Sequence, residues 1–202
     1  MTLLAALLSP VFCLGLGRAA QAAEPAAADE TANAATPEAI LAHPDSVEPF
    51  AYAQLITWLW GQGRREQATF WFYVMQARTR PWAQADHDGE GDGAAALRAS
   101  LNDQLGQVIN GWVASDPAAW KRIVERALSY EAHLPLNPAR PDGMTEPAWL
   151  ALVAKERAEY ASGAHTLFAG LDPAAVAAQR RKAGLYNGPL QSPGPALPED
   201  WR

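Results

Sequence analysis

The sequence predicts an all-α protein of about six helices that pack as antiparallel neighbours. Apolar side chains recur every three or four residues in segment after segment, and this spacing places them on one face of a helix. Asp-Pro pairs at 116–117 and 172–173 mark helix starts, because aspartate caps free amides and proline fits the first turn. No segment shows the alternating, β-branched pattern of a strand.

The N-terminal segment 1–22 is expected to be a secretory signal peptide. Residues 2–17 are mostly apolar but too few to span a membrane comfortably, and Ala20 and Ala22 supply the small residues of a cleavage site. We therefore predict cleavage after Ala22 and a periplasmic location. No Lys or Arg precedes the apolar run, so an uncleaved anchor stays open as an alternative. Cys13 lacks the small preceding residues that lipoprotein processing requires.

The rest of the chain divides into a leader, one domain and a tail. Residues 23–36 hold no large apolar side chain and are predicted to form a flexible leader. Residues 37–184 are long enough for a single buried core and are predicted to form one helical domain. The tail, 185–202, holds four prolines and is expected to lie extended along the body or to remain free.

Residues 49–80 are expected to form the helical hairpin around which the domain is built. A Gly-Gln-Gly turn separates its two helices, and the second helix carries the sequence FWFYVM at 70–75, the densest apolar run in the chain. A helix that is apolar most of the way round is buried by several neighbours. The second helix is therefore predicted to be central, with Arg78 and Arg80 at its negative end and a stop at Pro81.

The hairpin also carries a local family resemblance. Small and aromatic residues within 52–80 resemble the hairpin of tetratricopeptide and Sel1-type repeats, and these residues are Leu59, Gly61, Gly63, Ala68, Trp71 and Tyr73. The pattern occurs once, whereas repeat folds need several units, so the resemblance implies a similar hairpin, with a true solenoid as the alternative. The whole chain resembles small exported proteobacterial helical proteins of unassigned activity. Some of these serve as immunity or inhibitor proteins, which implies binding to another protein.

The remaining helices are predicted from capping residues and apolar spacing. The first runs from 94 to 113, and its core-facing residues are expected to be Leu97, Leu101, Leu105, Val108 or Ile109, and Trp112. The next extends from Asp116-Pro117 to about His133. A third is capped by Thr145 and ends at Gly163, and the last runs from Asp172-Pro173 to about Ala183, before a stop at Gly184.

The loop 86–93 combines acidic residues with glycines, which resembles a calcium-binding loop. Counted from Asp86, position twelve is Leu97, so the closing carboxylate of such a loop is missing. A solvated connector is the favoured interpretation, and weak cation binding remains the alternative.

No motif for catalysis, a cofactor or a metal is present. The four histidines, at 43, 87, 133 and 165, lack the spacing of metal ligands, and no GxSxG nucleophile motif occurs. Glu66 is the one acid whose apolar neighbours could raise its pKa, although an ion pair with Arg64 or Arg65, or exposure to solvent, is favoured. The net charge of −6, without clustered cations, argues against nucleic acids and anionic membranes as partners.

Eight tryptophans are the stronger functional signal. Four of them fall on helix stripes and are expected in the core, namely Trp71, Trp112, Trp120 and Trp149. Trp and Arg also anchor protein interfaces. We predict a non-catalytic protein that binds another protein, such as a secreted toxin or a cell-wall enzyme. The expected binding residues are Trp60, Arg64, Arg65, Arg78, Arg80 and Trp82. The alternative is a peptidoglycan-associated sugar binder or hydrolase, because sugars stack on the same flat rings.

Overall fold

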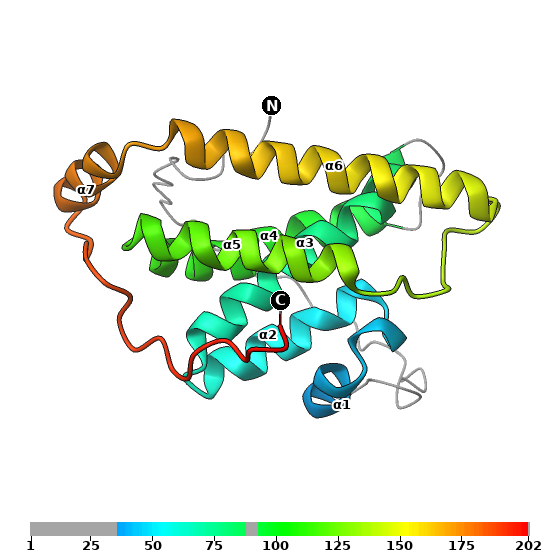
Figure 1. The fold of residues 1–202 in the computed structure, drawn as a ribbon, viewed down its shortest axis with the longest axis horizontal. Coiled ribbons are helices and arrows are strands. Elements are labelled where there is room, and N and C mark those ends of the chain that lie inside the picture. The colour runs from blue at the N-terminus through cyan, green and yellow to red at the C-terminus, as the bar shows by residue number, and fades with distance from the viewer. Residues whose placement is uncertain (1–35, 88–92, 202) are drawn as a thin grey trace, which may run out of the picture. The chain divides into compact units, whose positions relative to one another are not determined.

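The computed structural model describes residues 36–87 and 93–201, and within these ranges the chain is all-helical, with no strand (Figure 1). The predicted all-α fold is confirmed. The α-helices are α1 (Pro37–Ala42), α2 (Tyr52–Gly61), α3 (Arg65–His87), α4 (Ala94–Val113), α5 (Pro117–His133), α6 (Glu146–Gly170) and α7 (Pro173–Lys182). Two 3-10 turns, Pro44–Ser46 and Pro49–Ala51, join α1 to α2. The predicted signal peptide and the leader up to residue 35 lie outside the described residues.

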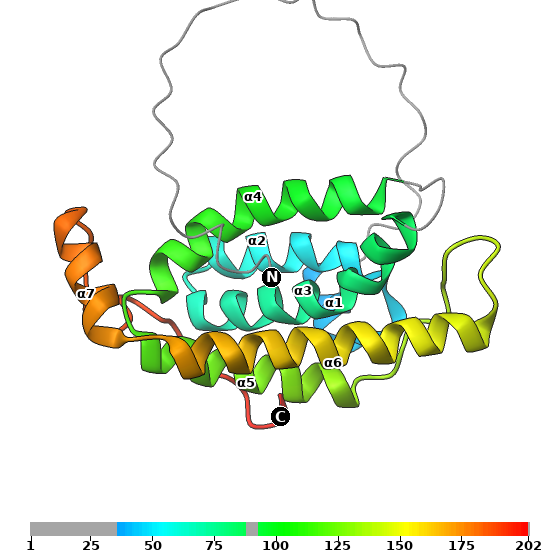
Figure 2. The same ribbon diagram turned by 90° about the horizontal axis from the view of Figure 1, so that it is seen from above.

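Helix α3 is the centre of the helical body. Every residue from Gln67 to Thr79 is buried, and α2, α4, α5 and α6 all pack against this helix. Figure 2 shows α3 lying between α4 and α6. The apolar run at 70–75 is therefore covered on all sides, as the sequence predicts for a helix with no polar face.

An aromatic cluster fills the core around Trp71. The ring of Trp71 lies 5.3 Å from Tyr52 of α2 and 5.7 Å from Tyr130 of α5, in tilted and edge-on geometries. Its neighbour Phe70 stacks on Trp201, with 5.1 Å between the ring centroids. Offset and edge-on contacts of this kind stabilise aromatic pairs beyond the area that they bury.

The predicted stop at Pro81 is wrong, because α3 continues through this proline to His87. Proline removes one amide donor and usually breaks a helix. Here tertiary contacts hold the additional turn. Trp82 packs edge-on against Trp149 of α6 at 5.2 Å, and the Asp86 carboxylate accepts a hydrogen bond of 2.7 Å from the backbone amide of Ala95.

Helix α6 likewise runs through Gly163, its predicted end, to Gly170. The added turns pack on the body, since Phe168 lies edge-on to Trp120 of α5 at 5.3 Å. The helix ends just before the Asp172-Pro173 pair, because a residue that precedes proline is disfavoured in the α conformation. The predicted caps Asp116, Thr145 and Asp172 all accept a hydrogen bond from a first-turn amide.

The tail after α7 lies along the body and is not free. Leu197 and Trp201 are each only 8% exposed and belong to the core. Figure 1 shows this segment leaving α7 and crossing to α2. Helix α7 itself has no buried residue. Among the two predicted alternatives for the tail, the structure shows the docked one.

Replacement of Trp71 tests the central position of α3. Trp71→Ala should lower the free energy of unfolding by about 3–5 kcal/mol, because the change removes a fully buried ring and leaves a cavity. The melting temperature, followed by circular dichroism, should fall by at least about 6 °C. An unchanged melting temperature would show that this ring does not contribute to the core.

Candidate functional site

An apolar groove runs between α2 and α4. It has a volume of about 120 Å³ and is lined by Ile56, Thr57, Trp60, Leu105, Val108 and Ile109. Helix α2 contributes no charged residue to it, because its sequence YAQLITWLWG contains none. Apolar concavities of this kind are the usual sites of recognition on a helical surface.

The leucines of α4 extend the groove into an exposed apolar row. Leu97 is 46% exposed and Val108 is 52% exposed, while Leu101 and Leu105 are half-buried. The apolar spacing of α4 predicts that this row lies in the core, with Val108 or Ile109 as its fourth member. Ile109 is the one of these two that is buried, and the inward prediction is wrong for Leu97.

Close packing of α4 on α3 explains why the row faces outward. Gly106 lies against Phe72 so closely that a Cβ atom added there would meet the Phe72 ring at 3.4 Å. On the same face, the Tyr73 hydroxyl donates a hydrogen bond of 2.7 Å to the Asn110 side chain. Helix α4 therefore turns its small and amide-bearing side towards the centre, and the leucines lie at its margin.

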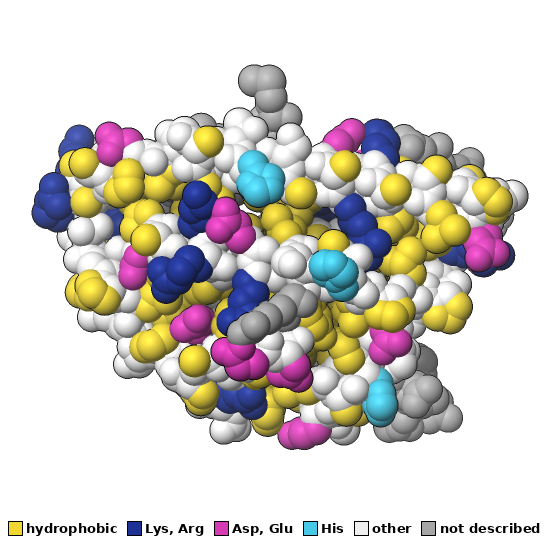
Figure 3. Space-filling model, in the orientation of Figure 1, with side chains coloured by type: hydrophobic (Ala, Val, Ile, Leu, Met, Phe, Trp, Pro, Cys, Tyr) yellow, Lys and Arg dark blue, Asp and Glu magenta, His cyan; other side chains and the backbone are white. Residues whose placement is uncertain are grey.

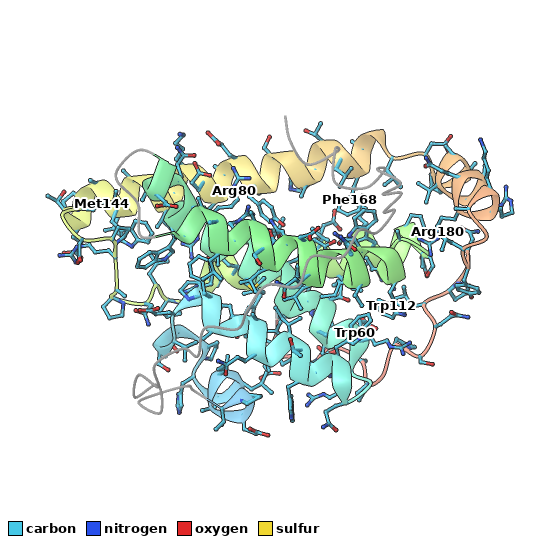
Figure 4. All side chains as sticks on the ribbon, turned by 180° about the vertical axis from the view of Figure 1, so that it is seen from behind. Trp60, Arg80, Trp112, Met144, Phe168 and Arg180 are labelled. Carbon is cyan, nitrogen blue, oxygen red and sulfur yellow. The ribbon has the colours of Figure 1, made fainter. Side chains whose placement is uncertain are left out.

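Two tryptophans and an arginine close one end of the groove. Trp60 and Trp112 meet edge to face, with 5.7 Å between their centroids, and Figure 4 shows the two side by side. The Arg65 guanidinium lies over the Trp60 ring at 5.5 Å. Arg64 lies over Trp58 at 5.6 Å. Neither arginine forms an ion pair with a carboxylate among the described residues.

The other predicted binding residues lie elsewhere on α3. Thirteen residues separate Arg65 from Arg78, a rise of about 20 Å along a helix. Figure 4 shows Arg80 well away from Trp60, beside α6. The structure brings Trp60, Arg64 and Arg65 together at the hairpin turn. It does not place Arg78, Arg80 and Trp82 with them.

Arg78 belongs to a buried ionic cluster between α3, α5 and α6. Its guanidinium lies 3.6 Å from the Glu131 carboxylate, and both side chains are almost completely buried. Arg157 donates to the same carboxylate at 2.8 Å, and Arg78 also donates to the carbonyl of Pro135 at 2.7 Å. Removing charges from water is costly unless they are paired in this way. Arg78 is therefore committed to holding three helices together.

Arg80 and Trp82 have structural partners as well. Arg80 donates two hydrogen bonds to one oxygen of Glu156, at 2.9 and 3.1 Å. It also lies over the Tyr160 ring at 5.5 Å. Burial raises the pKa of Tyr160 to about 12, against the opposing effect of Arg98 and Arg80, so this phenol stays neutral near pH 7.

The two buried acids among the described residues, Glu131 and Glu156, offer no free carboxylate. Glu131 lines a pocket with Arg78, Trp82 and Trp149, but the pocket has only about 20 Å³ of space, room for about one water molecule. Glu131 and Glu156 both carry arginine partners. Figure 3 shows acidic and basic side chains interspersed on the face formed by α5 and α6, with no gathering of one sign.

Metal binding finds no support in the described ranges, which contain no cluster of three His, Cys, Asp or Glu side chains. The central part of the acidic loop, 88–92, lies outside the described residues, so the choice between connector and cation site stays open. Within the described ranges, no helix is long and apolar enough to cross a membrane.

Sequence reasoning missed the side chains that hold the tail. Gln67, Trp112 and Arg126 donate hydrogen bonds to tail carbonyls. The sequence does not mark these residues, since Gln67 belongs to the polar start of α3, directly after Arg65 and Glu66. Comparison with known proteins adds nothing to this geometry, since no protein family, curated protein or solved structure matches the chain.

Removal of the Glu131 carboxylate should destabilise the fold strongly. Glu131→Ala leaves Arg78 buried without its acid and should cost about 3–5 kcal/mol in the free energy of unfolding. Glu125→Ala is the matched control on the same helix, because Glu125 forms an exposed pair with Lys121 worth at most about 1 kcal/mol. Urea denaturation of both variants measures the difference. Equal effects would contradict the assigned role of the cluster.

Glu66 makes a pH-dependent contribution to stability. Desolvation raises the pKa of this half-buried carboxyl, with Arg122 and Arg126 opposing the shift. The folded state therefore binds the proton more tightly than the unfolded state, and stability falls as pH rises through the two pKa values. Glu66→Gln should raise the melting temperature at pH 7 and give little gain near pH 3. A gain at pH 3 that equals or exceeds the gain at pH 7 would contradict this sign.

Proposed function

We propose that this chain is a non-catalytic, exported protein that acts by binding another protein at the groove between α2 and α4. The observation that carries the proposal is the apolar row on α4, whose Leu97 and Val108 are about half exposed although their spacing is that of a core stripe. Contiguous exposed apolar surfaces mark protein-binding sites, whereas singly exposed apolar side chains do not.

The geometry favours a helical segment of the partner as the occupant. The row steps by four, four and three residues from Leu97 to Val108, over about 16 Å of helix. An amphipathic helix that lies in such a groove presents apolar side chains at a matching spacing. Trp60, at the end of the groove, is the residue type that most often dominates such interfaces.

Charge indicates where an acidic residue of the partner helix would lie. The groove itself carries no charge from α2, while Arg65 lies over Trp60 at its end without a carboxylate partner among the described ion pairs. A carboxylate on the partner helix would form an ion pair with the Arg65 guanidinium through two parallel hydrogen bonds. A secreted toxin or a cell-wall enzyme with an acidic, apolar helix fits these requirements, and the chain would then act as its immunity or inhibitor protein.

Surface variants in the groove test the proposal. Val108→Asp places a charge where the partner helix would be apolar, and should weaken binding by at least about tenfold. Leu150→Asp on α6 is the matched control, because Leu150 is exposed to a similar extent, 47% against 52% for Val108, and lies on another helix. Both variants should keep the wild-type melting temperature within about 2 °C, since surface changes cost about 0.5 kcal/mol or less.

The measurement is affinity capture from periplasmic extract, followed by a titration of the captured protein against the three chains. Loss of binding with Val108→Asp and retention with Leu150→Asp would support the groove. Equal binding by both variants would overturn the groove as the site. If the purified wild-type chain degraded peptidoglycan and captured no protein, the hydrolase alternative would replace the proposal.

A further inference from the structure

The C-terminal segment docks on the helical body in the manner of a bound peptide. We call residues 189–201 the strap and the surface beneath it the strap channel. The strap contains no helix or strand, yet its ring of Trp201 stacks on Phe70 and lies 5.4 Å from Trp71. Leu197 is buried beside them.

Hydrogen bonds between channel and strap run in one direction. The channel donates, and the carbonyl groups of the strap accept. Trp112 Nε1 donates to the carbonyl of Gln191 at 2.9 Å, and the Glu66 amide donates to that of Pro193 at 2.9 Å. Gln67 Nε2 donates to the carbonyl of Ala196 at 3.0 Å.

The far end of the strap is held in the same way by a single arginine. Arg126 Nε donates to the carbonyl of Trp201 at 2.7 Å, and its second nitrogen donates to the carbonyl of Pro198. Four of the strap residues are prolines, which have a carbonyl but no amide hydrogen. A surface lined with hydrogen-bond donors therefore suits a proline-rich backbone, because the peptide then needs to supply only carbonyl acceptors.

Glycine allows the closest approach between strap and channel. A Cβ atom on Gly194 would lie 2.5 Å from the carbonyl oxygen of Gly63, in the turn between α2 and α3, and 2.9 Å from the Arg64 Cα. The φ angle of Gly194 is +79°, in the left-handed region that other residues rarely adopt. The channel therefore selects the strap at Gly194 by the close fit of the backbone, in addition to the contacts of the Trp201 ring.

The link between strap and body is weakly packed. Helix α7 has no buried residue, and Leu185 and Tyr186, which follow it, are 52% and 43% exposed. The strap is thus tethered by a segment with exposed side chains, which the Gly188 amide joins to the body through a hydrogen bond of 3.0 Å to the Ser115 carbonyl. A ligand on a loose tether benefits from a high effective concentration, and it can still be replaced by a competing ligand.

We propose that the strap channel is a peptide-binding site for extended, proline-rich segments that end in an aromatic ring, and that the strap occupies it in cis until such a segment of another protein displaces it. The elements that define the ligand are a leucine, a proline and, three residues further on, a tryptophan, as in Leu197, Pro198 and Trp201. Extended, proline-rich segments are the ligands that aromatic-lined grooves select, and this channel presents Phe70, Trp71 and Trp112 to the strap. Trp112 and Arg65, which close one end of the α2–α4 groove, also donate to the strap carbonyl of Gln191. The row from Leu97 to Val108 makes none of the strap contacts described above, so the proposal stands without the proposed function.

The test frees the strap from its tether in the full chain. A protease site inserted between Leu185 and Tyr186 is cut after folding, and a fluorescent peptide of residues 186–202 is titrated into the cut protein. We expect saturable exchange into the cut chain and about tenfold weaker binding to the uncut chain, whose strap competes in cis. A Trp201→Ala peptide should not bind. A Gly194→Ala peptide should bind at least about tenfold more weakly, while Ala196→Ser, at an exposed side chain, should bind normally.

A second peptide tests the ligand class. It carries only the Leu-Pro-x-x-Trp elements on an unrelated proline-containing sequence, with a scrambled peptide of the same composition as its control. Selective binding of the ordered peptide supports the proposal, and equal binding of both overturns it. Full-chain Gly194→Ala, without the inserted protease site, should bind the fluorescent peptide more tightly than wild type, because its own strap no longer fits the channel. Gly111→Ala is the control, since a Cβ atom added there meets nothing within 4 Å. If the Gly194→Ala chain folds but does not bind the fluorescent peptide, the proposal is overturned. It is also overturned if the chain forms dimers by exchanging straps but does not bind the unrelated Leu-Pro-x-x-Trp peptide.

Discussion

Burial of α3 on every side is the constraint on which the structure depends. A helix with one apolar face needs one layer of neighbours, but this one is covered by four helices and by the strap. The polar residues that it carries are buried as well, so each needs a partner inside the body. Gln67 finds the strap carbonyls, and Arg78 finds Glu131 and the loop that follows α5. The central helix thus determines where the internal charges and amides of its neighbours must lie.

Local chemistry predicted where the helices begin better than where they end. Asp116 and Asp172 cap their helices as expected, because a cap needs only the amides of the next few residues. Ends depend on what lies nearby in space. Pro81 lowers the local preference for helix, but the contact between Trp82 and Trp149 lies with residues far away in sequence. Gly163 is also a weak stop, which α6 overrides through its packing on α5.

The candidate surface was predictable only in part, for the same reason. Trp60 and Arg65 are neighbours across a tight turn, so their proximity follows from the hairpin. Arg78 looks equally exposed in the sequence, and nothing local indicates that Glu131, more than fifty residues later, would pair with it. The apolar spacing of α4 correctly identified one face of a helix. It could not show that the opposite face, with Gly106, makes the closer contact with α3.

The stack between Phe70 and Trp201 joins rings that are 131 positions apart (201 − 70). Contacts of such long sequence separation carry the largest cost of loop closure and form late in folding. While the chain emerges from the ribosome, the aromatic run of α3 is made early and stays without this cover until almost all the described residues have been synthesised. The newly made protein therefore passes through a period in which its most apolar helix is incompletely covered. An exposed apolar surface of this kind is prone to aggregation and is what chaperones recognise.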